Sequence, residues 1–123
     1  MVQYLKFDSR EGTMAPFVFE DSNVPPVCLL RVQDVIMVDS RSAGEQYCYV
    51  YYNIPSPNHN GSAGEWVNLP YTRVKFSASQ TDYNGTNWLR GEIEKALQMT
   101  DGPSILTVTS TPPVTIEKIA TWA

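Results

Sequence analysis

The sequence has few of the residue types on which most metal and catalytic sites depend. Its 123 residues include one histidine, His59, and two cysteines, Cys28 and Cys48. A structural zinc site takes four cysteine or histidine ligands, and the whole chain has three. A disulfide framework in a small domain normally uses more cysteines, so we expect both thiols to be buried as small apolar side chains. We expect no metal and no other cofactor.

The chain also lacks an excess of positive charge and a long apolar run. Nine basic residues stand against thirteen acidic ones, which gives a net charge of -4. This balance argues against strong electrostatic binding of phosphate over a large surface, although it is compatible with a local basic patch. No run approaches the roughly 18 apolar residues of a membrane span, and the first residues lack the layout of a secretory signal. We therefore expect neither membrane association nor secretion.

Candidate catalytic groups are sparse and lie in ordinary surroundings. His59 lies in a polar segment, where a single histidine is usually a solvated surface residue, and no motif pairs it with either cysteine. Asp34, Asp39 and Glu45 could converge as a carboxylate cluster for hydrolysis, but acids at strand ends commonly keep turns solvated. We expect a protein that is not an enzyme, with a hydrolase as the most distant of three hypotheses.

What the sequence does contain is a succession of short strand patterns in a chain of single-domain length. We expect residues 1–123 to form one domain that is mainly β (α+β by count). Its core would be a small, mostly antiparallel barrel or sandwich of six or seven strands. The expected strands are Val2–Phe7, Pro16–Phe19, Tyr47–Tyr52, Tyr71–Ser79, Ile105–Thr109 and Val114–Ile119. Val27–Asp39 is expected to form either one long bent strand or two with a bulge near Gln33–Asp34.

One helix is expected, near Asn87–Met99, and one flexible loop, at about 53–65. Leu89, Ile93, Ala96 and Leu97 form a single apolar stripe at helical spacing, whereas the acidic and basic residues between them are expected to face water. Thr86 or Asn87 can cap the start of this helix. The loop is rich in proline, glycine and asparagine, and a long irregular segment in a small domain is either mobile or functional.

The strongest functional pattern is a row of tyrosines. Tyr47, Tyr49 and Tyr51 alternate along one strand and therefore share one face, and Arg73 and Lys75 alternate along the next. Such a face can stack single-stranded bases, but tyrosine is also favoured at protein interfaces. The third reading is that the rings simply cover a core. These five residues are the candidate contacts for nucleic acid or for another protein chain.

The order of strands, long hairpin, helix and closing strands resembles that of small β-rich proteins of marine phages, the cyanophage type. The matching segments are Val32–Ile36, Ser104–Thr109 and Val114–Ala120. Some members of that group are similar to Sm-like small barrels that assemble as rings, and others are thought to be virion proteins. The Sm uridine-pocket motifs are missing here: Met37 has no following Asn, and Arg90-Gly91 lies in the expected helix.

From these patterns and this resemblance we expect a non-enzymatic, self-assembling phage-type protein, a virion or accessory structural component that forms a homo-oligomer, with a ring as one form. The alternative is an Sm-like or OB-like protein that binds single-stranded nucleic acid. The expected partners are copies of this chain, other phage proteins or single-stranded nucleic acid. The expected location is the cytoplasm of an infected bacterial host or the virion.

Overall fold

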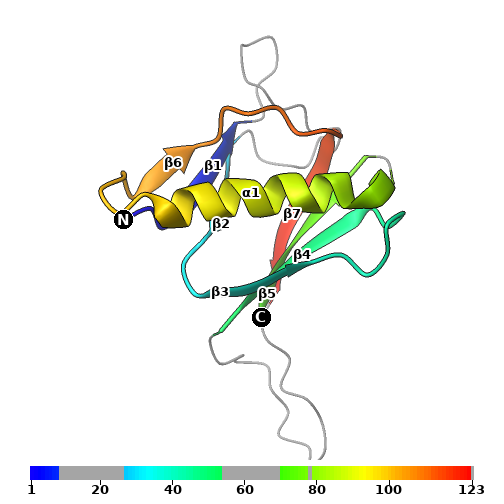
Figure 1. Cartoon of the computed structure of the whole chain (residues 1–123), viewed down its shortest axis with the longest axis horizontal. Helices are drawn as coiled ribbons and strands as arrows, with labels where there is room; N and C mark the ends of the chain where they lie inside the picture. Colours follow the sequence, from blue (N-terminus) through cyan, green and yellow to red (C-terminus); the bar gives the residue numbers. More distant parts are fainter. Residues whose placement is uncertain (9–26, 54–69, 78, 123) are drawn as a thin grey trace, which may run out of the picture.

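A computed structural model describes residues 1–8, 27–53, 70–77 and 79–122. Within these residues the chain is mainly β with one α-helix, as the sequence predicts (Figure 1). The expected strand Pro16–Phe19, nearly all of the expected loop 53–65 and His59 lie outside the described residues. The elements are β1 (Tyr4–Asp8), β2 (Val27–Arg31), β3 (Val35–Asp39), β4 (Tyr47–Tyr52), β5 (Tyr71–Phe76), a 3₁₀-helix η1 (Thr81–Tyr83), α1 (Asn84–Gln98), β6 (Ile105–Thr107) and β7 (Ile116–Trp122).

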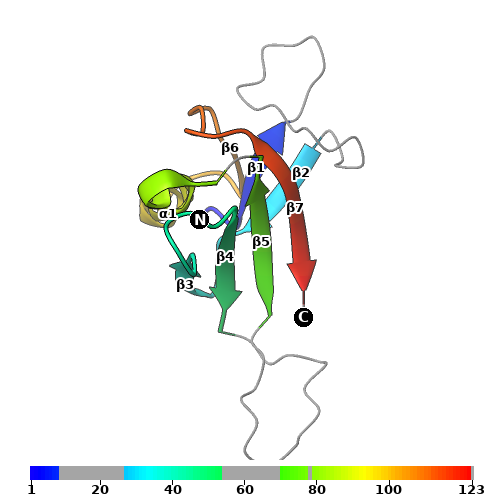
Figure 2. The same ribbon diagram turned by 90° about the vertical axis from the view of Figure 1, so that its right-hand side faces the viewer.

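The strands form two sheets. One has three strands in the order β2-β1-β6, and the other has four in the order β3-β4-β5-β7. All pairs among the described strands are antiparallel except β1 and β6, which are parallel; the chain passes through α1 before β6 returns beside β1. Figure 2 shows β4, β5 and β7 side by side, with β3 at the outer edge of their sheet.

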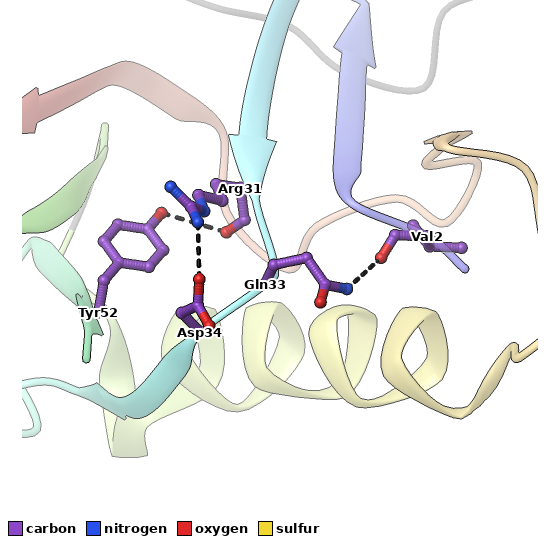
Figure 3. A network of polar contacts seen from close by, with 5 residues as sticks. All are labelled: Val2, Arg31, Gln33, Asp34 and Tyr52. Atoms are coloured by element: carbon purple, nitrogen blue, oxygen red, sulfur yellow. Dashed lines mark hydrogen bonds and ion pairs between the residues drawn. The ribbon is translucent and has the colours of Figure 1, made fainter. Parts of the chain in front are cut away.

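The apolar run Val27–Asp39 divides into two strands that belong to different sheets. The bend between them lies at Asp34, which adopts a left-handed backbone conformation with φ 63°. The Arg31 side chain donates to Asp34 Oδ2 at 2.6 Å across the bend, and Gln33 Nε2 donates to the Val2 carbonyl at 2.6 Å (Figure 3). The Tyr52 hydroxyl, from β4, donates to the Arg31 carbonyl at 3.1 Å and so ties the second sheet to the end of β2.

The core fills the space between the inner faces of the two sheets and α1. On β4 and β5 every second residue points inward and is buried: Cys48, Val50, Tyr52, Thr72, Val74 and Phe76. From the three-stranded sheet Leu5, Phe7 and Leu30 join the same cluster. The two cysteines are buried free thiols, as expected, and burial raises the pKa of Cys48 to about 12.

The helix contributes Leu89, Ile93 and Ala96 to this core, as its spacing predicts, but two other expectations for it are wrong. Leu97 is about half exposed, whereas Glu92 is buried. The Ser110 hydroxyl donates to Glu92 Oε1, and Lys95 Nζ lies 3.1 Å from the same oxygen. Glu92 lies three residues after Leu89 and four before Ala96, so helical spacing places it on the buried side of α1, where Ser110 and Lys95 supply its polar partners.

The start of α1 is also not capped as expected. Its N-cap residue is Tyr83, which makes no side-chain cap hydrogen bond, and neither Thr86 nor Asn87 takes that position. Gln80, which is fully buried, accepts hydrogen bonds from the Thr86 backbone N–H and hydroxyl, each at 2.7 Å. Gln80 Nε2 in turn donates to the Tyr47 carbonyl at 2.9 Å, so one side chain joins the first turn of α1 to β4.

Candidate functional site

The outward side of the four-stranded sheet carries the aromatic residues singled out in the sequence. Because side chains alternate along a strand, burying every second residue of β4 and β5 leaves the others on the opposite side. We call this surface the tyrosine face, formed by Tyr47, Tyr49, Tyr51, Tyr71, Arg73 and Lys75. All five candidate residues lie on it, together with Tyr71, which the sequence analysis did not single out.

The register of β4 against β5 places these side chains in cross-strand pairs. Tyr47 lies opposite Lys75, Tyr49 opposite Arg73, and Tyr51 opposite Tyr71. Directly opposed side chains on one face of an antiparallel pair lie close enough to interact. The two rows therefore form one surface rather than two separate patches.

The tyrosine rings pack against one another along and across the strands. The Tyr49 and Tyr51 rings are stacked, with centroids 6.2 Å apart and an angle of 22° between their planes. The Tyr49 ring centroid also lies 6.3 Å from that of Tyr47 and 5.8 Å from that of Tyr71, which it contacts edge to face. As a result only 5% of Tyr49 is exposed, although it lies on the outward side of the sheet. Its neighbours Tyr47, Tyr51 and Tyr71 keep partly exposed rings.

Cationic side chains cover parts of these rings. The Arg73 guanidinium lies 4.5 Å from the Tyr47 ring centroid, and the Lys75 ammonium lies 5.9 Å from the same centroid. Arg41, from the turn between β3 and β4, lies 4.8 Å from the Tyr49 ring centroid. Cation–π contacts of this length are attractive because the ring face carries the negative part of the quadrupole. These contacts stabilise the positions of the rings, and the surface presents both aromatic and cationic groups.

Two carboxylates accept hydrogen bonds from the tyrosine face and from Arg41 beside it. Glu45 accepts from the Tyr49 hydroxyl at 3.1 Å and from the Arg41 backbone N–H at 2.7 Å, and Glu117 accepts from Lys75 at 2.8 Å. Burial raises the pKa of Tyr49, and its bond to Glu45 raises it further. The bond to Glu117 raises the pKa of Lys75. Both groups therefore keep their protons at neutral pH, with Tyr49 neutral and Lys75 charged.

The charges on and around the tyrosine face nearly balance. On the described part of the chain the basic residues there are Arg41, Arg73, Lys75 and Lys118, and the acidic ones are Asp39, Glu45 and Glu117. Phosphate-binding surfaces are instead dominated by unneutralised lysine and arginine. The composition is closer to that of a protein interface, in which tyrosine and arginine are enriched.

The candidate set omits Tyr71, which belongs to the tyrosine face, and Arg41, which lies over the Tyr49 ring beside it. Tyr71 is two residues before Arg73, so the same alternation that groups Tyr47, Tyr49 and Tyr51 could have placed it. Arg41 lies in a turn, where no periodicity applies, and only the tertiary structure brings it over Tyr49.

The carboxylates considered for catalysis do not form one cluster. Asp34 and Asp39 lie at opposite ends of β3; Asp34 is paired with Arg31, and Glu45 is bonded to Tyr49. Among the described residues, no group of three histidine, cysteine or acidic side chains is placed to hold a metal ion. A shallow polar hollow of about 240 Å³ lies at the other sheet, lined by Gln3, Tyr4, Arg31 and Gln33.

The described residues form two β-sheets, and the larger sheet has an aromatic outer face. No family model, no curated protein and no solved structure matches the chain. Within the part of the chain that is described, none of the helices is long and apolar enough to cross a membrane.

Proposed function

We propose that this protein is a non-enzymatic structural protein that associates with copies of itself through the tyrosine face. The observation that carries the proposal is the continuous row of tyrosine rings on the outward side of β4 and β5, where no described residue of the same chain forms a further layer. Tyrosine presents a large apolar ring with a polar hydroxyl, which suits a surface that is wet in the monomer and buried in a complex.

The balanced charge of the surface supports a protein partner. The described cations nearest the rings lie beside Glu45 or Glu117, or rest on the rings themselves. A second copy meets the same balanced surface, so the contact need not oppose large like charges. The resemblance of the sequence to small phage proteins extends the proposal to a virion or accessory component of a phage.

Self-association can be tested by changing one partly exposed ring of the face. We expect Tyr51→Asp to raise the dissociation constant of the oligomer at least about tenfold, equivalent to roughly 1.4 kcal/mol, because it introduces an unpaired charge among the rings. The measurement is sedimentation velocity over about a hundredfold range of concentration, since association depends on mass action.

The matched control is Tyr83→Asp, which changes an exposed tyrosine at the start of α1, where a positive φ tolerates aspartate. This variant should associate like the unchanged protein. A chain that stays monomeric at the highest concentration would overturn the proposal, as would equal dissociation constants for the two variants.

The second candidate function is binding of single-stranded nucleic acid. It is favoured by the position of Arg73 and Lys75 on the same face as Tyr47, which could combine phosphate contact with stacking. Fluorescence anisotropy with short labelled RNA and DNA at about 50 and about 200 mM salt tests it, because phosphate contacts weaken over that range. We expect no saturable binding at the lower salt; saturable, salt-dependent binding would favour this second function.

A further inference from the structure

The two outer strands of the four-stranded sheet differ in how their free edges are protected. Both strands show a register shift against their neighbour, β7 near Ile116 and β3 between Val35 and Met37, but only on β7 do charged residues of both signs, Glu117 and Lys118, lie beside it. Bulges and charged side chains, lysine above all, are the usual means of preventing a sheet edge from pairing with another chain. The strand β3 contains no basic residue and no proline.

The β3 edge is also apolar. Ile36 is 51% exposed and Met37 is 47% exposed, and no described strand pairs with the outer side of β3 (Figures 1 and 2). An exposed edge of this kind has unpaired backbone groups ready to accept a further strand. Its register with β4 also places Met37 opposite Tyr51, so this edge adjoins the tyrosine face directly.

The position of the charge in β3 is compatible with pairing to a second copy of the same strand. Its single charged residue, Asp39, stands at its end. If two β3 strands pair antiparallel about a two-fold axis near Met37, the two Asp39 residues lie about four residue positions apart along the strands, or roughly 13 Å. This separation exceeds the Debye length of about 8 Å at physiological ionic strength, so their repulsion is largely screened. The centre of the contact is then purely apolar.

We propose that two copies of this chain pair through β3, antiparallel and about a two-fold axis near Met37. The pairing joins two four-stranded sheets into one and makes the two tyrosine faces continuous. It rests on the proposed self-association and adds a second contact to it, because edge pairing sets the two tyrosine faces side by side and leaves them open to a further copy. A five-residue edge alone is smaller than the roughly 20–30 residues a side of a stable interface. The remaining area then comes from the tyrosine face, which adjoins this edge where Tyr51 lies opposite Met37.

The two-fold axis gives this proposal a sharp test, because each copy presents Met37 to the same residue of its partner. We expect Met37→Lys and Met37→Glu each to weaken self-association at least tenfold, since like charges meet at the axis. An equimolar mixture of the two variants should recover association, because opposite charges then meet. Sedimentation velocity of the separate and mixed variants measures both effects.

Leu97 provides the control, because it is a similarly exposed apolar residue that lies on α1 and not on the β3 edge. Leu97→Lys and Leu97→Glu should leave association unchanged. As an independent measurement, Met37→Cys should form disulfide-linked dimers under mild oxidation and Leu97→Cys should not, since the native thiols are buried.

The outcomes separate this proposal from the one on which it rests. If the unchanged protein is monomeric, self-association itself fails. If the protein associates but the Met37 variants associate equally well, or Met37→Cys does not cross-link, β3 pairing is overturned while assembly through the tyrosine face stands. If both charged variants weaken association and their mixture does not recover, the contact lacks the two-fold axis and the proposal is wrong.

Discussion

Replacing Gln80 by leucine is expected to destabilise the protein by about 3 kcal/mol or more. Leucine has a similar volume, but it removes the two hydrogen bonds accepted from Thr86 and the one donated to Tyr47. Each intramolecular hydrogen bond contributes about 1 kcal/mol, and a buried polar group left unsatisfied costs about 1–3 kcal/mol. Because small proteins have only about 5–15 kcal/mol of stability in total, this single change removes a large share of it.

Urea unfolding followed by tryptophan fluorescence measures the effect as a lower midpoint. The control is Gln98→Leu, at the exposed end of α1, which should shift the midpoint little. Equal midpoints for Gln80→Leu and the unchanged protein would show that this side chain does not join the helix to β4.

Replacing two glycines of α1 by alanine, one at a time, is expected to change the stability of the protein in opposite directions. At Gly85 an added Cβ would lie 2.5 Å from Cε2 and 2.7 Å from Cζ of Phe76, whose ring is fully buried. Overpacking of this kind costs about 1–3 kcal/mol. At Gly91 no described atom outside the backbone of the helix itself lies within 4 Å of the added Cβ, so Gly91→Ala gains the helix propensity of alanine, up to about 1 kcal/mol.

Thermal unfolding of the two variants gives the comparison, because both replace a helical glycine and differ mainly in what the methyl group meets. We expect a lower Tm for Gly85→Ala and a higher Tm for Gly91→Ala. A rise for both would mean that α1 and β5 do not approach each other as closely as Phe76 and Gly85 indicate.

Most of the fold could be predicted from the sequence because its periodicities are strong. The alternation in Tyr47–Tyr52 fixes which residues face the core, and the spacing of Leu89, Ile93 and Ala96 fixes the buried side of the helix. The sequence pointed to Gln33–Asp34 as the place of a break in Val27–Asp39 but left open whether the run forms one bent strand or two, because β-branched residues continue through it. The division depends on the left-handed backbone at Asp34, a conformation that aspartate tolerates but that its neighbours do not signal.

The candidate site was predicted in part for the same reason. Alternation groups Tyr47, Tyr49 and Tyr51 on one face and Arg73 and Lys75 on another, but it cannot say that the two strands are neighbours. The pairing of β4 with β5 makes them one surface. The contact of Arg41 with Tyr49 depends on a turn that has no periodic pattern.

The sequence by itself determined the β-rich class, the single helix and the burial of alternate residues, because these follow from local spacing of apolar side chains. The tertiary structure decided the rest: the parallel pairing of β1 with β6, the hydrogen bond from Ser110 to Glu92, and the joining of α1 to β4 through Gln80. Each of these depends on residues distant in sequence, and contacts of that kind leave no periodic trace along the chain.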